Sequence, residues 1–230
     1  MTPDLIAQLD EVRERWNALR HPFYRRWERG DLGRGELAVY AGQYRHAVVA
    51  LADLAGKAGD TEHASEERAH VALWDDFARA CGAGPSEPIA ETRGLVAAFG
   101  AAAPGAEADA VLYAIEASQP AVSRTKHAGL VDHYGFDADG SGTAYFRLHA
   151  ELDVEHAAEA AGRLRTANGS SAAALARAEA AVSANWRLLD GVERLLGRQE
   201  GLAECRSSLG CDGRPAHPSG TRCVPSGRHN

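Results

Sequence analysis

The sequence predicts an all-α protein, and three observations support this fold class. Apolar residues recur at helical spacing along nearly every segment of the 230-residue chain. No convincing stretch alternates apolar and polar residues as a half-buried strand does. Glycine and proline stand between the periodic segments, where they end helices. The expected architecture is a bundle of about seven helices around one core.

The N-terminal half is expected to hold three long helices. The first covers 3–19, and its apolar side carries Leu5, Leu9, Val12, Trp16 and Leu19. Proline and glycine surround an aromatic stretch over 21–35, so this segment is expected to interrupt the helical structure. A second helix follows over about 35–56 and a third over about 61–81, where Gly82 ends it.

The C-terminal half is expected to hold four more helices. A short one near 87–99 precedes a longer one over about 107–128, which Pro120 is expected to bend. A further helix is expected over about 143–167, and the last over about 170–198.

Composition predicts one helical domain over residues 1–200 and a disordered tail over 201–230, which is rich in Gly, Pro, Ser and Arg. The formal net charge of −7 and the lack of a long Lys/Arg cluster argue against a nucleic-acid partner. The apolar runs are too short to span a bilayer. The acidic, amphipathic N-terminus does not resemble a secretory signal peptide, so a cytoplasmic location is expected.

The stretch "YFRLHAELDVEHAAEA" places three polar side chains on one stripe of the helix expected over 143–167. On a regular helix, His149, Asp153 and His156 fall within roughly 60° of one another. Buried imidazoles and carboxylates need partners. A metal ion would supply them, but so would hydrogen bonds between core histidines, the aspartate and the backbone. The stripe alone leaves both interpretations open.

The helix expected over 61–81 contains Glu67 and His70 at the i, i+3 spacing with which di-iron carboxylate proteins bind iron in a bundle core. Glu62, His63 and Glu66 lie close to the same face. A solvated glutamate face is the alternative interpretation of this pattern.

Another carboxylate, Glu116, is the only one in the apolar run over 110–117. A lone glutamate of this kind is more often a surface residue whose carboxylate reaches water. Taken together, however, three helices present a mixture of carboxylates and imidazoles that suits iron.

The chain resembles the heme-oxygenase-like di-iron oxidases and oxygenases over about residues 15–165. These proteins are related to the thiaminase-II-like and coenzyme-PQQ-synthesis proteins. The resemblance rests on "HPFYRRWERGDLGRGELAVYAGQYRHAV", "EHASEERAHVALWDDFARACG", "LYAIEASQP", "GLVDHYG" and "YFRLHAELDVEHA". The last is the most specific, because H-x-x-x-D-x-x-H after an aromatic pair is the metal motif of the family. The thiaminase-type relatives lack this motif and use a cysteine nucleophile.

The resemblance implies a seven-helix heme-oxygenase-like bundle with two iron ions. His70 and His149 resemble the two imidazoles around one iron, which also takes a carboxylate from the third helix. Glu116, Asp153 and His156 resemble the ligands of the other iron.

The position of the third-helix carboxylate stays open among four residues that lie close together. Glu67 is expected first and Glu62 second, with His63 and Glu66 as the other candidates. His63 stands where some relatives have glutamate. Glu67 resembles an additional carboxylate of family members that oxygenate nitrogen.

The resemblance implies a non-heme di-iron monooxygenase or oxidase that uses O2 and an external electron donor and acts on a small amine or an amino-acid-like molecule. N-oxygenation of an amine to a hydroxylamine or nitro product, in the biosynthesis of a specialised metabolite, is favoured. The alternative is oxidative C–C or C–H cleavage of an amino acid or fatty acid. Relatives of this kind are often homodimers.

Two other functions are weighed against this one. A thiaminase-like hydrolase would need a nucleophilic cysteine in the core, and Cys81, at the end of the third helix, does not resemble that position. A non-catalytic binding protein on the same fold would have to bury carboxylates without a metal, which is costly.

Overall fold

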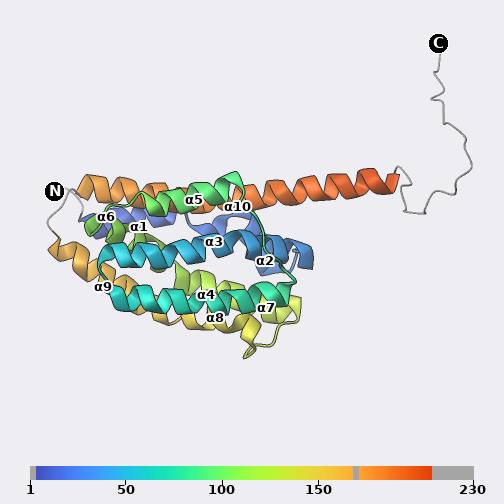
Figure 1. The fold of residues 1–230 in the computed structure, drawn as a ribbon, viewed down its shortest axis with the longest axis horizontal. Coiled ribbons are helices and arrows are strands. Elements are labelled where there is room, and N and C mark those ends of the chain that lie inside the picture. The colour runs from blue at the N-terminus through green and yellow to red at the C-terminus, as the bar shows by residue number, and fades with distance from the viewer. Residues whose placement is uncertain (1–3, 168–170, 209–230) are drawn as a thin grey trace, which may run out of the picture. The chain divides into compact units, whose positions relative to one another are not determined.

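The computed structural model describes residues 4–167 and 171–208, with side chains described up to Gly197. In these ranges the chain forms ten α-helices and one 3₁₀ helix and no strand (Figure 1), which confirms the predicted all-α class. In chain order the helices are α1 (Leu5–Arg15), η1 (Ala18–Arg20), α2 (Pro22–Arg29), α3 (Arg34–Ala58), α4 (Thr61–Cys81), α5 (Ala90–Gly100), α6 (Ala106–Glu116), α7 (Gln119–Tyr134), α8 (Ser141–His149), α9 (Leu152–Thr166) and α10 (Ser171–Ser208).

The central helix of the bundle is α3, which packs on α4, α5 and α6. Figure 1 shows α3 and α4 running side by side along most of their lengths. Helix α4 also packs on α8, and α6 packs on α9. This arrangement brings one face each of α4, α6, α8 and α9 toward a shared region of the interior.

Helix α4 covers the range that the sequence predicts, because both of its ends carry strong signals. The Asp60 carboxylate accepts a hydrogen bond from the backbone N–H of His63 (3.0 Å) and caps the first turn. At the other end Gly82 has a φ of 78°, the left-handed conformation that stops a helix. These two caps fix the register with which α4 presents its buried histidines and glutamate.

The expectation of a broken segment over 21–35 is wrong, because helix α2 lies there. His21 caps this helix, Pro22 occupies its first turn, and Gly30 ends it with a φ of 75°. Proline in the first turn costs no hydrogen bond, and glycine just past the end is the usual stop. The same residues that indicate an interruption therefore mark the start and end of a two-turn helix.

Two predicted helices are each divided in the structure. The helix expected over 107–128 is split into α6 and α7 at Ala117–Ser118, because Pro120 occupies the first turn of α7 and has no N–H to continue the α6 ladder. The helix expected over 143–167 is split into α8 and α9 by a tightened turn, in which the Glu151 N–H donates to the Leu148 carbonyl (3.1 Å). The histidine stripe therefore spans two helices.

Helix α10 continues past the predicted end near residue 198, and its backbone is described to Ser208. The chain divides into a compact unit over Met1–Leu196 and a second unit from Gly197 onward. The expected disordered tail falls mostly on residues 209–230, which lie outside the described residues, so it stays a prediction.

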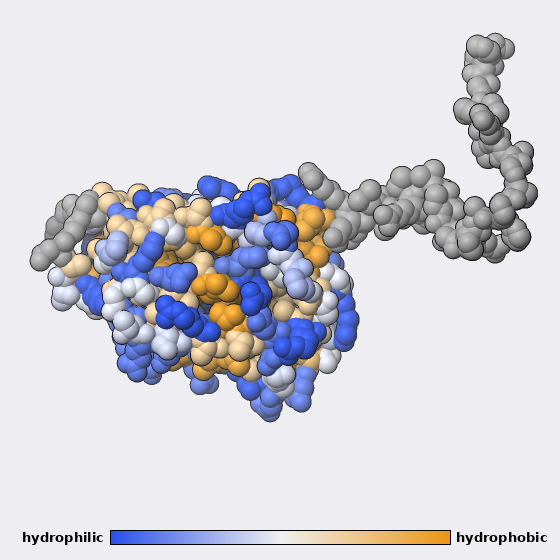
Figure 2. All heavy atoms as spheres, in the orientation of Figure 1, coloured by the Kyte–Doolittle hydropathy of each residue, from blue (hydrophilic) through white to orange (hydrophobic). Residues whose placement is uncertain are grey.

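None of the described helices is long and apolar enough to cross a membrane. Figure 2 shows hydrophilic residues spread over the face of the molecule that it draws, among smaller hydrophobic areas.

Packed aromatic side chains fill the part of the core between α2, α3, α4 and α8. The ring of Trp27 contacts those of Phe23, Tyr40, Phe77 and Phe146 at centroid distances of 5.5–6.4 Å. Its indole N–H donates to the Lys126 carbonyl of α7 (3.1 Å). The close approach of α2 to α7 depends on Gly129, where an added Cβ would lie 2.7 Å from Trp27 Cδ1.

We expect Gly129→Ala to lower the free energy of unfolding by about 1–3 kcal/mol, because the fully buried Trp27 ring has no space into which to move. Gly94→Ala in α5 is the matched control: an added Cβ there meets nothing within 4 Å, and the change should raise stability by about 0.5–1 kcal/mol. Chemical denaturation measures both values. Equal effects of the two substitutions would contradict the account of the α2–α7 contact.

Candidate metal centre

Seven side chains that can bind metal meet in the interior, and four helices supply them. Helix α4 contributes His63, Glu67 and His70; α6 contributes Glu116; α8 contributes His149; and α9 contributes Asp153 and His156. All seven are buried. Their ligand atoms form three groups, in each of which the atoms lie within 4.8 Å of one another.

The first group consists of Glu67, His70 and His149. Glu67 and His70 are one helical turn apart, and His70 Nδ1–H donates to Glu67 Oε1 (3.2 Å). His149 comes from the end of α8, and its ring meets that of His70 edge-on at 4.9 Å. The group therefore offers two imidazoles and one carboxylate.

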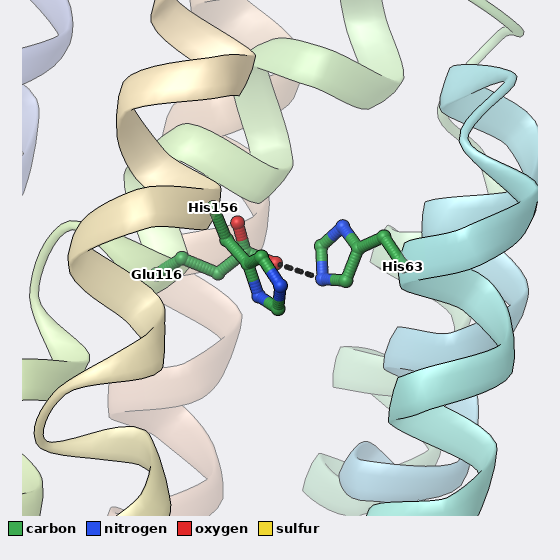
Figure 3. Close-up of side chains that lie close together, drawn as sticks. All are labelled: His63, Glu116 and His156. Atoms are coloured by element: carbon green, nitrogen blue, oxygen red, sulfur yellow. Dashed lines mark ion pairs between the residues drawn. The ribbon is translucent and has the colours of Figure 1, made fainter.

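The second group consists of His63, Glu116 and His156, and Figure 3 shows these side chains pointing toward one another from three helices. His63 Nε2 lies 3.0 Å from Glu116 Oε1, and the rings of His63 and His156 are 3.9 Å apart. This group also offers two imidazoles and one carboxylate. A third group, Glu67, Asp153 and His156, contains one residue of each of the other two and thereby links them.

Eight ligand-type atoms of this region are buried without a hydrogen-bond partner. They are His63 Nδ1 and Nε2, Glu67 Oε2, Glu116 Oε1 and Oε2, His149 Nε2, Asp153 Oδ2 and His156 Nδ1. A buried polar atom without a partner costs free energy comparable to a lost hydrogen bond. Eight such atoms in one region indicate a binding site, in which a bound ion or ligand takes the place of hydrogen-bond partners from the protein.

Hydrogen bonds orient several of these side chains and leave the unpartnered atoms free to bind metal. His149 donates from Nδ1 to Asp153 Oδ1 (3.0 Å), which leaves the lone pair of Nε2 available. His156 donates from Nε2 to Glu66 Oε2 (3.2 Å), which leaves Nδ1 available. Metal-binding histidines commonly donate their other ring N–H to a carboxylate, which fixes the tautomer and the ring.

Burial is the largest single influence on the pKa of Glu116 and of Glu67, but it decides the direction of the shift only at Glu116. It raises the pKa of Glu116 to about 7, although the neighbouring His63 opposes the shift. Burial also acts to raise the pKa of Glu67, but the hydrogen bond from His70 and the nearby charge of His149 outweigh it and lower that pKa.

The pKa values of His63 and His149 move in the opposite sense from what burial alone would give. Burial lowers the pKa of His63, but Glu116 and Glu67 outweigh it, and the pKa is raised. Burial likewise opposes protonation of His149, whose pKa is raised by Asp153 and then by Glu67. The carboxylates thus draw positive charge into the site.

The donor set fits iron. Two imidazoles with one carboxylate, and positions left open, are typical of non-heme ferrous sites in enzymes that use oxygen. Each of the first two groups has this composition, and Asp153 adds an oxygen donor between them.

A family model described as an iron-containing redox enzyme matches residues 58–190, more than half of the chain. The chain belongs to this family. The matched range contains all seven side chains of the site. The protein is therefore an oxidoreductase, and the predicted enzyme class is confirmed at this level.

Among curated proteins, this iron-containing redox enzyme is similar to 4-aminobenzoate synthases. The Chlamydia muridarum protein of that name is 31% identical over 179 residues, covering 68% of this chain and 75% of its own length. The one from Nitrosomonas europaea is 29% identical over 222 residues, covering 80% of this chain and 89% of its own.

A solved structure shows the fold. A domain of unknown function with a heme oxygenase-like fold from Shewanella denitrificans superposes with a TM-score of 0.67 at 18% sequence identity. The match covers 94% of this chain and 100% of that domain. The predicted heme-oxygenase-like bundle is confirmed.

The structure brings together six of the seven residues predicted as ligands, all except Glu62. The Glu62 side chain is exposed at the first turn of α4 and belongs to none of the three groups. His63, the next residue, turns inward to Glu116 instead. Glu66 lies at the rim, partly exposed, where it accepts the bond from His156. The assignment of iron ligands stays a prediction.

The sequence leaves His63 among four candidates for the ligand from the third helix, but it does not favour this residue. Its spacing to Glu67 and His70, four and seven residues, was the available signal, since these positions share one helix face. Which of the adjacent Glu62 and His63 faces inward depends on the exact phase of α4, which periodicity alone does not give.

Lys126 of α7 is a buried residue near the site that the sequence did not single out. Its ammonium nitrogen donates to the Tyr40 hydroxyl (2.7 Å) and lies 4.9–5.9 Å from the ring centres of Tyr24, Tyr40, Tyr44, Trp74 and Phe146. No ion pair with a carboxylate is present for it among the described residues. Burial lowers its pKa to about 7, so a large share of Lys126 is uncharged near neutral pH and can exchange a proton.

A small cavity lies beside these aromatic residues. It encloses about 30 Å³ and is lined by Tyr24, Tyr44, Ile115, Gln119 and Asn185, among others. Tyr24 and Tyr44 line this cavity, whereas Tyr40 and Phe146 pack in the core. Tyr113 instead donates to Asp10 (2.8 Å).

The thiaminase-like alternative finds no support in Cys81. This thiol is buried at the end of α4, and burial raises its pKa to about 12. A nucleophilic cysteine needs the opposite shift, because the thiolate is the reactive form.

We expect Glu116→Gln to stabilise the metal-free enzyme by about 1–3 kcal/mol at pH 8 while it weakens iron binding. The substitution removes a buried negative charge whose burial cost the neighbouring His63 offsets only in part. Denaturation in the presence of a chelator gives the first value, and an iron assay the second. Glu28→Gln, at an exposed position, is the control and should change stability by less than about 0.5 kcal/mol. A metal-free Glu116→Gln protein less stable than the wild type would contradict a metal-binding role for this carboxylate.

Proposed function

We propose that this enzyme is an oxygen-dependent non-heme di-iron oxidoreductase that forms 4-aminobenzoate or a closely related amino-substituted aromatic acid. The observation that carries the proposal is the pair of two-imidazole, one-carboxylate groups, linked through Glu67, Asp153 and His156. The names of the curated relatives supply the product class. Two adjacent sites of this composition are what two iron ions acting together on O2 require.

The grouping supports one assignment of ligands to the two irons. Glu67, His70 and His149 would hold one ion, and His63, Glu116 and His156 the other. Asp153 would supply a further carboxylate donor, and Glu67 belongs to two of the three groups. Iron supplies the reaction with dioxygen, which amino-acid side chains do not perform. The side chains supply fixed ligand positions, and their carboxylates balance the charge of the ions.

The aromatic side of the site suits a reaction shielded from water. Aromatic rings and Lys126 enclose one side, and the adjacent cavity of about 30 Å³ has room for dioxygen or about two water molecules. An aromatic ring needs more space than this, so entry of a larger substrate requires movement of the lining side chains. The uncharged form of Lys126 would accept a proton, and its hydrogen bond with the Tyr40 hydroxyl would hold the amine in position.

N-oxygenation of a small amine is the second candidate, and Glu67 favours it. Its Oε2 atom is unpartnered, and the residue belongs to two of the three groups. An additional shared carboxylate would hold the second iron more firmly through a reaction on an amine. Under either proposal we expect an external electron donor and a cytoplasmic location.

We expect the wild-type enzyme, loaded anaerobically with ferrous iron, to retain about two irons per chain, and His149→Ala to retain at most one. His149 is a ligand in only one group, and His133→Ala, an exposed histidine of α7, is the matched control. Iron analysis after desalting measures the stoichiometry. Full retention of iron by His149→Ala would contradict the proposed ligand set.

Formation of 4-aminobenzoate can be tested in a bacterial strain that requires this compound for growth. Expression of the wild-type enzyme should restore growth without added 4-aminobenzoate, and expression of Glu116→Ala should not, at equal protein levels. Failure of the wild-type enzyme to restore growth would argue against this product. Transfer of labelled oxygen from O2 to a supplied amine in vitro would then favour N-oxygenation.

A further inference from the structure

An acidic groove opens directly above the second ligand group, between the first turns of α4 and α9. It has a volume of about 320 Å³ and is lined by Asp60, Glu62, His63, Glu66, Leu152, Glu155, His156 and Glu159. The histidines at its base are the buried His63 and His156 of the candidate metal centre. The groove thus connects solvent with a group of unpartnered ligand atoms.

Four of the five carboxylates of this groove form two pairs, one on each wall. Glu62 and Glu66 are one turn apart on α4, and Glu155 and Glu159 are one turn apart on α9. The partial positive charge at a helix N-terminus favours acidic residues in the first turn, and this accounts for Glu62 and Glu155. It does not explain Glu66 and Glu159, which lie a turn further along.

The charges of the groove are only partly neutralised within the protein. Asp60 is paired with Arg163 (3.1 Å), and Glu159 lies near the same guanidinium. Glu66 accepts the hydrogen bond from His156 and keeps 42% of its side chain exposed. Glu66 therefore touches solvent on one side and a candidate iron ligand on the other.

The base of the groove points to a cation. Both ring nitrogens of His63 and the Nδ1 atom of His156 are buried without a hydrogen-bond partner. His63 keeps only 3% of its surface exposed, and it faces the carboxylate of Glu116. A divalent cation that moves down the groove would pass from exposed carboxylates to Glu66 and then to these imidazoles.

We propose that this groove is the route by which divalent metal enters the site, with Glu62, Glu155 and Glu159 attracting the ion and Glu66 passing it to His156. The inference rests on the proposed function, because it requires that the enclosed groups bind metal. A cleft lined by charges of one sign raises the local concentration of counter-ions and their rate of association. This effect falls as ionic strength rises.

The test is the rate at which the full-length metal-free protein takes up cobalt(II), a probe whose visible absorption reports coordination. The variant Glu62→Gln/Glu155→Gln/Glu159→Gln leaves Glu66 and all seven side chains of the centre in place. The control Glu11→Gln/Glu28→Gln/Asp132→Asn removes the same charge from exposed positions on α1, α2 and α7. Circular dichroism checks that both variants fold.

At low ionic strength we expect uptake by the groove variant to be about tenfold slower than by the control, with the same final stoichiometry and a weaker dependence on salt. Equal uptake rates in the two variants would overturn the inference. A lower final stoichiometry in the groove variant would also overturn it, since the carboxylates would then act as ligands. If the wild-type protein takes up no metal at all, the proposed function itself fails.

Discussion

The structure depends on one electrostatic constraint: three carboxylates and four imidazoles share a small, buried volume. Glu67, Glu116 and Asp153 have almost no exposed surface, and each has at least one oxygen without a hydrogen-bond partner. Water cannot solvate these oxygens, and the histidines neutralise them only in part. Cations supplied from outside the protein resolve this conflict, so the site costs stability in their absence and gains it when they bind.

The rest of the bundle holds these groups in place. Capping by Asp60 and Gly82 sets the phase of α4, which alone supplies three of the seven side chains. The tightened turn between α8 and α9 lets His149 and Asp153 approach to 3.0 Å from two helices. Around them, the aromatic core and the close contact at Gly129 give the helices little freedom to shift. Rigid support of this kind is what keeps ligand atoms at fixed positions.

Much of the fold could be predicted from periodicity and from helix start and stop signals. Helix α4 lies where it was expected, because Asp60 and Gly82 are strong and unambiguous signals. Helix α2 is not predicted, because proline and glycine can bound a short helix as well as interrupt a long one. In the structure Pro22 starts α2 and Gly30 ends it. The division at Ala150–Glu151 has neither proline nor glycine, so the local sequence gives no signal for it.

The site was predictable where spacing along one helix decides the geometry. Glu67 with His70, and Asp153 with His156, are separated by one turn and must lie on one face. The resemblance to the family favours Glu62 over His63, because it implies a carboxylate from this helix. The phase of α4 instead turns His63 inward and leaves Glu62 in solvent. The approach of Lys126 to five aromatic rings is a long-range contact between helices, which one sequence without relatives does not reveal.

Anomalous X-ray diffraction at the iron absorption edge tests most directly the proposal that two metal ions lie within the cluster. Crystals of the enzyme loaded anaerobically with ferrous iron should show two strong peaks. One is expected beside Glu67, His70 and His149, and the other beside His63, Glu116 and His156. A single peak, or two peaks outside this cluster, would contradict the account.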